Sequence, residues 1–134
     1  MLQTLRGRQH QVHTGFVLHD LGSGQTHQAV HTALVTMRDY SDAEIDAYVA
    51  SGDPLDKAGA YAIQHPTFRP VARLDGCFTG VMGLSLCQIL VLWREWDLPF
   101  RADMEAIRAA HQGYPCPLLQ VLMTDDLDHL THDA

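Results

Sequence analysis

The sequence predicts an α/β protein, because strand-like and helix-like segments alternate along its 134 residues. Apolar and polar residues alternate over 10–19 and 29–38, which is typical of strands, and apolar residues recur at three- and four-residue spacings over 84–96, which is typical of a helix. Apolar residues make up 46% of the chain and charged residues 19%, so the composition is that of an ordinary globular protein with one domain.

The first two strands are predicted to form a hairpin. Over 10–19, Val12 and Phe16 alternate with polar residues, and the second run continues through the apolar Val35. The connecting residues 20–25 are polar and glycine-rich, so we interpret them as a hairpin loop and not as a dinucleotide-binding turn. A third, shorter strand is predicted over 68–74, although prolines lie in and before it.

A helix of about ten residues is predicted to follow the hairpin. Ser41 and Glu44 form a capping-box pattern at its start, and Gly52 followed by Pro54 ends it. This capping explains Glu44, to which we assign no chemistry. The apolar residues of the helix are expected on one face: Ile45, Tyr48 and Val49.

Two further helices are predicted toward the C-terminus. The first covers 84–96, with an inward face of Leu86, Ile89, Leu90, Trp93 and Trp96. The second covers 102–112, with Met104 and Ile107 inward and Gly113 at its end. Residues 116–134 end in an acidic tail that contains histidines, and we expect this tail to fray.

Charge and cysteine content restrict the function classes. A net charge of −7 argues against nucleic-acid binding, which needs a basic surface, but it leaves room for a nucleotide in a locally positive pocket. No apolar run approaches the ~18 residues of a membrane span, and no signal peptide is recognisable. Three cysteines without Cys-x-x-Cys spacing are expected to be reduced thiols in a cytoplasmic protein.

The only lysine of the chain, Lys57, lies in the run GDPLDKAGAYAIQ at 52–64. A lysine ammonium is a compact, flexible point charge that suits phosphate binding, and the glycines and proline around it shape a loop. The alternative is a solvated lysine in a surface turn.

The surrounding residues resemble the Maf family of nucleoside triphosphate pyrophosphatases, also called septum-formation inhibitor-like proteins. The run LRGRQHQVHTG at 5–15 is similar to the family pattern LSGR-x-H-x-V-x-TG, and DKAGAY-x-IQ is similar to its most specific loop. The resemblance covers roughly residues 2–93 and corresponds to the C-terminal half of the family. The family's earlier Ser-x-Arg-Arg, ADT and GKP motifs do not occur in this sequence.

The resemblance implies a mixed, twisted sheet with flanking helices, like the Maf and inosine-triphosphatase folds, and we expect this chain to lack the N-terminal lobe. We therefore divide it into residues 1–96, the C-terminal half of a Maf-like domain, and residues 97–134, an extension with a helix and the acidic tail. Within 76–86, Gly80 and Ser85 stand where the family usually has Asn and Pro.

The implied activity is hydrolysis of dTTP- or UTP-type nucleotides to monophosphate and pyrophosphate, assisted by Mg²⁺ or Mn²⁺. Lys57 would neutralise the triphosphate, and Asp56 would orient Lys57 or hold the cation through water. Gln64 matches the family glutamine that is implied to contact the nucleotide. The alternatives are a loop-stabilising carboxylate for Asp56 and a structural amide for Gln64.

Two other functions stay open. One alternative is that the chain is a truncated, catalytically inert relic, or one subunit of a split or oligomeric protein. Such a subunit would pair with a second copy or with a separately encoded N-terminal half. An uncovered sheet edge would favour such pairing. A role as an interaction module in septum formation rests on the family's name alone.

The nine histidines do not predict a metal site. Three pairs have close spacings, His10/His13, His27/His31 and His129/His132, but none has a third ligand in the same helix, and the first pair would face opposite sides of a strand. His10 matches the family's motif histidine, and we expect it to pack at the start of a strand. No local signature supports a Cys–His nucleophile pair for any of the three thiols. No metal ligand is therefore assigned.

Overall fold

The computed structural model describes residues 1–98 and 101–130, with side chains through residue 124. The tail that was expected to fray over 116–134 is corrected in part, because residues 117–130 form a helix, and 131–134 lie outside the described residues. The elements follow one another as α1 (Leu2–Leu5), β1 (Gln9–His19), β2 (Thr26–Met37), α2 (Asp42–Ala50), the 3-10 helices η1 (Asp53–Asp56) and η2 (Ala58–Ala60), β3 (Val71–Asp75), α3 (Phe78–Met82), α4 (Leu86–Glu95), α5 (Met104–Ala110) and α6 (Pro117–Leu130).

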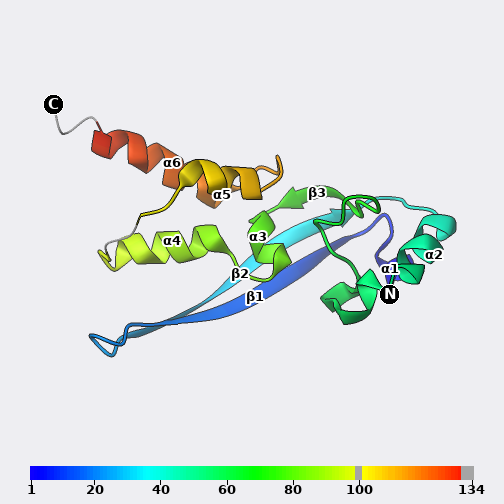
Figure 1. Ribbon diagram of the computed structural model, residues 1–134, viewed down its shortest axis with the longest axis horizontal. Coiled ribbons are helices and arrows are strands. Elements are labelled where there is room, and N and C mark those ends of the chain that lie inside the picture. Colours follow the sequence, from blue (N-terminus) through cyan, green and yellow to red (C-terminus); the bar gives the residue numbers. More distant parts are fainter. Residues whose placement is uncertain (99–100, 131–134) are drawn as a thin grey trace.

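The three strands form one sheet in the order β1-β2-β3, and both pairings are antiparallel. The predicted hairpin is confirmed: β1 pairs with β2 along its whole length, from Gln9 opposite Thr36 to His19 opposite Thr26. It forms a long twisted ribbon (Figure 1). The third strand is shorter than predicted and begins at Val71, because Pro70 has no amide hydrogen to give to the ladder.

One face of the sheet is buried under the N-terminal helices and the loop that follows α2. Along β2, Ala33, Val35 and Met37 alternate with more exposed residues, as the period of a strand requires. They belong to a group of buried apolar side chains that we call the sheet core: Leu2, Ala33, Val35, Met37, Tyr40, Ile45, Tyr48, Tyr61, Ile63, Phe68, Val71, Leu74 and Phe78.

Helix α2 forms as the capping-box pattern predicts. The Ser41 hydroxyl accepts from the Glu44 amide, and the Glu44 carboxylate accepts from the Ser41 amide. Gly52 follows with a φ of 79°, which only glycine adopts readily. The predicted apolar face is correct for Ile45 and Tyr48 but wrong for Val49, which is 45% exposed. Val49 lies in the last turn of the helix, on a side that faces solvent.

Helices α4, α5 and α6 form a separate group beside the distal part of the hairpin (Figure 1). They enclose a second set of buried side chains, the C-terminal core: Cys77, Cys87, Cys116, Leu119 and Leu122. Met104 and Ile107 of α5 pack against it as predicted. The predicted inward face of α4 is wrong in part: Leu86 is 37% exposed, whereas Cys87 and Leu92 are buried. The buried stripe follows the contacts with α6, which the sequence of α4 alone does not show.

None of the helices within the described residues has the length and hydropathy that crossing a bilayer requires.

Candidate functional site

The loop that carries the lone lysine is built from two short 3-10 helices. η1 covers Asp53–Asp56 and η2 covers Ala58–Ala60, so Lys57 is the junction between them. Two residues of η2 have left-handed backbone angles, Gly59 with a φ of 74° and Ala60 with a φ of 62°. A side chain at Gly59 would also meet the Tyr61 ring at 3.3 Å, which explains the glycine at this position.

The ammonium group of Lys57 is held by this loop. Its Nζ lies 2.9 Å from Oδ1 of Asp56 and 3.4 Å from Oδ1 of Asp53, and it donates to the Asp53 carbonyl at 3.2 Å. The lysine side chain is 30% exposed, so one side of it faces solvent. The predicted pairing of Lys57 with Asp56 is therefore present, and Asp53 is a second partner that the sequence analysis did not single out.

Tyr48 connects this loop to helix α2. Its hydroxyl donates to Oδ2 of Asp53 at 2.5 Å and accepts from the Ala62 amide at 3.0 Å. The ring stacks on Phe68 at a centroid distance of 4.2 Å. A buried hydroxyl with a donor and an acceptor partner positions both ends of the loop, since leaving either partner unpaired is costly.

The electrostatics of the loop follow from these contacts. The hydrogen bond to Lys57 lowers the pKa of Asp56, and the hydrogen bond from Tyr48 lowers the pKa of Asp53. The Asp56 carboxylate in turn raises the pKa of Lys57. Burial and the bond to Asp53 raise the pKa of Tyr48 to about 12. Lys57, Asp53 and Asp56 are therefore all ionised near neutral pH, and together they carry a net charge of −1.

Gln64 lines a cavity of about 600 Å³. Two arginines, Arg38 and Arg69, contribute to its wall, together with the turn at 112–115. Within the described residues the Gln64 amide makes no side-chain hydrogen bond, so it is available to a ligand or to water. Lys57 and Asp56 do not line this cavity, so the structure places the predicted site residues in one loop but not around one cavity.

Arg38 is a contributor that the sequence analysis missed. It pairs with Glu44 at 2.8 Å and donates to the Phe68 and Arg69 carbonyls. Glu44 therefore both caps α2 and holds this arginine at the cavity wall. No pattern in the sequence identifies Arg38, because its partners come from α2 and from residues thirty positions away.

His10 and His13, the first of the histidine pairs, lie on opposite faces of β1 as expected. His10 lies on the inner face of β1, where its Nε2 is 2.9 Å from the Tyr61 hydroxyl, whereas His13 is exposed and contacts Thr32. The expected packing role of His10 is thus present. His132 lies outside the described residues.

A different group of metal-ligating side chains was missed. Cys77, Cys87, His111 and Cys116 are all buried, and their ligand atoms lie within 4.8 Å of one another. Hydrogen bonds from Cys116 and then Cys87 lower the pKa of Cys77, while the Cys87 thiol has a raised pKa. The sequence gives no signal because the four residues come from four separate segments and not from a Cys-x-x-Cys motif.

Comparison with known proteins gives a consistent result. Residues 1–96 match the family model described as Maf-like protein. A dTTP/UTP pyrophosphatase of Thermomicrobium roseum is 39% identical over 130 residues, covering 92% of this chain and 56% of the relative. A dTTP/UTP pyrophosphatase of Nitrosomonas europaea is 45% identical, covering 71% of this chain and 45% of the relative. A nucleoside triphosphate pyrophosphatase of Haemophilus ducreyi is 42% identical, covering 73% and 49%.

The chain thus spans about half the length of the curated relatives it matches. The match to the Thermomicrobium protein covers 92% of the chain. Because this is longer than residues 1–96, the match includes part of the C-terminal helices.

Proposed function

Because this chain belongs to the Maf family, we propose that it supplies one part of a nucleoside triphosphate pyrophosphatase site. The substrates would be dTTP- and UTP-type nucleotides, and the products would be the monophosphate and pyrophosphate. The single observation that carries the proposal is the Lys57 loop, in which an otherwise lysine-free chain fixes one ammonium group between two carboxylates.

The role of Lys57 is to contact the phosphates. Because Asp53 and Asp56 keep it protonated and hold its stem, the ammonium group is placed before the ligand arrives. A fixed positive charge stabilises the charge that develops on phosphate oxygens during transfer, since no rearrangement is needed at that moment. One side of the side chain faces solvent and gives the phosphates access.

A divalent cation fits this loop, in line with the Mg²⁺ or Mn²⁺ that the family resemblance implies. The lysine and two carboxylates have a net charge of −1, which alone would repel a triphosphate. Hard divalent cations prefer oxygen ligands, and Asp56, with an 83% exposed side chain, offers a carboxylate directly or through water. When bound, the cation would neutralise phosphate charge and activate water.

Gln64 is proposed to contact the nucleotide. The cavity of about 600 Å³ beside it is within the usual size range of small-molecule sites, roughly 300–1,000 Å³. A pyrimidine such as uracil presents a donor flanked by acceptors, and an amide can pair with one of each. Arg38 and Arg69 on the same wall add positive potential for an anionic ligand.

A second candidate is that the chain is inert alone and works as one part of a larger assembly. Strand β1 is an edge of the sheet within the described residues, and its eleven residues pair only with β2. A long edge of unpaired amides and carbonyls is a template for another strand. We propose that either a second copy or a separately encoded Maf N-terminal half would occupy it.

The test is to measure dTTP and UTP binding by calorimetry and pyrophosphate release with Mn²⁺, using the purified chain and Lys57→Met. Loss of one charge-assisted contact is expected to weaken binding about 10- to 100-fold. Arg101→Met is the matched control: it removes one exposed positive charge outside the loop and the cavity, and it should leave binding unchanged.

The outcomes separate the two candidates. Binding with turnover that Lys57→Met abolishes supports the autonomous enzyme. Binding without turnover supports a site completed by another polypeptide, and mixing with the N-terminal half of a relative should then restore activity. Failure of the wild-type chain to bind either nucleotide, or equal binding by Lys57→Met, contradicts the assignment of this loop.

A further inference from the structure

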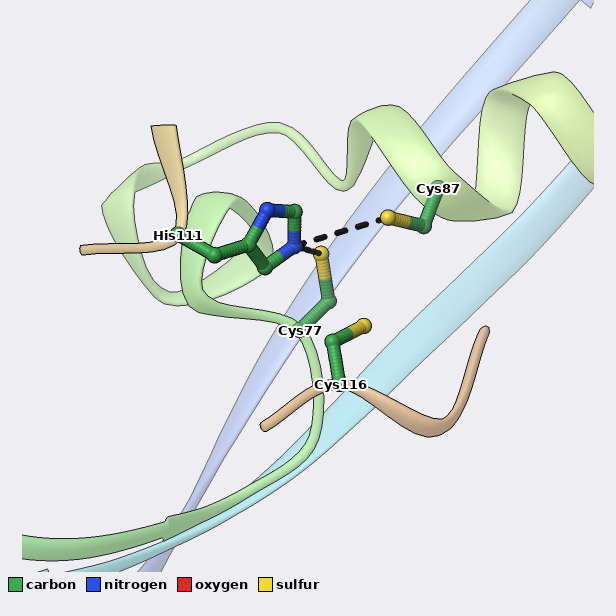
Figure 2. Close-up of side chains that lie close together, drawn as sticks. All are labelled: Cys77, Cys87, His111 and Cys116. Atoms are coloured by element: carbon green, nitrogen blue, oxygen red, sulfur yellow. Dashed lines mark hydrogen bonds between the residues drawn. The ribbon is translucent and has the colours of Figure 1, made fainter. Parts of the chain in front are cut away.

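The four-residue group of Cys77, Cys87, His111 and Cys116, here called the Cys/His cluster, has no role in the proposed nucleotide site. Its members come from different elements: Cys77 precedes α3, Cys87 lies in the first turn of α4, His111 follows α5, and Cys116 directly precedes α6. Figure 2 shows the three sulfur atoms and the imidazole ring pointing toward a common centre.

The spacing of the four ligand atoms is close to that of a tetrahedral zinc site. His111 Nε2 lies 3.4 Å from the Cys77 sulfur and 3.5 Å from the Cys87 sulfur, and all four ligand atoms lie within 4.8 Å of one another. A zinc ion with Zn–S bonds of about 2.3 Å and Zn–N bonds of about 2.0 Å sets its ligand atoms about 3.5–3.8 Å apart. Small side-chain movements would therefore suffice to bind it.

His111 is oriented as metal-binding histidines are. Its Nδ1 lies 2.7 Å from the Ile107 carbonyl, to which it must donate, since a carbonyl only accepts. That bond fixes the tautomer and leaves a lone pair on Nε2, which faces the sulfurs. The residue is 1% exposed, and the polar groups in contact with that nitrogen are the Cys77 and Cys87 sulfurs.

The turn between His111 and Cys116 carries backbone strain that serves the cluster. Gln112 has a φ of 50° and Gly113 a φ of 83°, so two successive residues are left-handed, and the first is not a glycine. Non-glycine residues in this region cost roughly 1 kcal/mol or more. The strained turn reverses the chain tightly enough for His111 and Cys116 to reach the same centre.

Buried cysteine alone is ordinary, because a free thiol packs like a small apolar side chain. Here, however, every cysteine of the chain converges on one point, together with a buried histidine. The three thiols are free and unpaired by disulfides. Apolar packing explains burial of the sulfurs, but it does not explain an imidazole nitrogen that contacts the sulfurs of Cys77 and Cys87 and lies within 4.8 Å of the third.

We propose that the Cys/His cluster binds one structural Zn²⁺ with Cys₃His ligation. Binding would release the thiol protons, so three thiolates, one neutral imidazole and the ion carry a net charge of −1. With four protein ligands no position is left for water, so the site is closed and structural. It joins β3 and α3, which belong to the family-matched region, to α5 and α6 of the C-terminal extension.

The test is Co²⁺ titration of the reduced, metal-free chain, read by visible absorption. Tetrahedral Co²⁺ gives visible bands, and thiolate ligands add a near-ultraviolet sulfur-to-metal charge-transfer band that histidine and carboxylate ligands do not give. We expect saturation at about one Co²⁺ per chain and displacement by Zn²⁺. A chain that binds no Co²⁺, or shows bands without thiolate character, overturns the proposal.

Two variants and a control complete the experiment. Cys116→Ser and His111→Ala should each lower zinc content by about 10-fold or more and change or remove the cobalt spectrum, because three ligands remain. His13→Gln, which removes an exposed histidine, should leave both unchanged. If Cys116→Ser fails to fold, the wild-type titration still decides the question. Wild-type zinc content retained in the two cluster variants contradicts the site, whatever the nucleotide assays show.

Discussion

The two cores of this molecule are built on different principles. The sheet core is made of thirteen buried residues, five of them aromatic, packed on an antiparallel sheet. The C-terminal core has five buried residues, of which three are cysteines, between short helices joined by loops. The first is packed from apolar side chains alone, whereas the second surrounds three thiols with partly buried apolar side chains from α4, α5 and α6, and under the zinc proposal it also depends on the bound metal.

The difference teaches where a chain of this size needs more than the hydrophobic effect. Small helical groups that cannot build a large core are commonly stabilised by a metal or by disulfides. The two cores meet at α3, where Phe78 belongs to the sheet core and the preceding Cys77 to the C-terminal core. Perturbing each core in turn therefore tests whether the two are coupled.

The largest effect should come from metal removal, measured by hydrogen exchange of backbone amides. Chelation of bound zinc is expected to lower protection in α4, α5 and α6 by at least about 4 kcal/mol, the stabilisation that a ligand provides at ~1,000 times its Kd. Amides of β1 and β2 should retain their protection. Equal loss of protection in both regions would show that the cores form one unit.

The next largest effect is expected for Phe78→Ala, which perturbs the sheet core and not the C-terminal core. Phe78 is fully buried and stacks on Tyr114 at 5.2 Å, so truncation should lower the free energy of unfolding by about 3–5 kcal/mol. Urea denaturation measures this. Leu21→Ala, at a position 89% exposed, is the control and should change it by less than about 0.5 kcal/mol. The Co²⁺ spectrum should survive in Phe78→Ala, and its loss would couple the two cores.

Tyr48→Phe tests the connection between the sheet core and the Lys57 loop. The variant keeps the ring packing but leaves the buried Ala62 amide without its acceptor, which costs about 1–3 kcal/mol. It also removes the donor to Asp53. We therefore expect lower stability and weaker dTTP binding together, measured by thermal melting and calorimetry. Unchanged binding would show that Tyr48 does not position the loop.

The smallest expected effect is the contribution of His10 to the pH dependence of folding stability. Burial lowers its pKa below the ordinary value of 6.5, and its buried Nδ1 has no partner, so the folded state resists protonation more than the unfolded chain does. The stability contributed by neutral His10 is full above pH 6.5 and declines as the pH falls through the lower folded-state pKa.

This decline should be visible in urea denaturation of the metal-free chain above and below pH 6.5. His10→Gln should flatten it, while His13→Gln, at an exposed position, should not. An identical pH dependence in His10→Gln and wild type would assign the decline to other groups.

Much of the fold could be predicted from local patterns. The hairpin, the capping box at Ser41, and the end of α2 at Gly52 all depend on neighbouring residues, and all are present. Predictions that depend on partners elsewhere in the chain did less well, as with the exposure of Val49 and the buried stripe of α4. Loop contacts between Lys57 and Asp56 were predictable because they are adjacent.

The candidate sites show the same contrast between features set by neighbouring residues and features set by distant ones. The DKAGAY-x-IQ run identified the loop for which we propose nucleotide binding, but the contributions of Tyr48 and Arg38 became visible only when α2 was placed against it. The Cys/His cluster could not be predicted, since its members at 77, 87, 111 and 116 follow no metal-binding spacing. Tertiary packing alone brings them together, at the junction of the family-matched region and the C-terminal helices.

The most direct test of this account is native mass spectrometry of the freshly purified chain, compared with its mass after denaturation in acid. We expect the native mass to exceed the denatured mass by one zinc ion, with the compensating loss of thiol protons, and Cys116→Ser to show no such excess. Equal native and denatured masses, with the C-terminal helices folded and all three thiols reduced, would contradict the claim that a metal organises the second core.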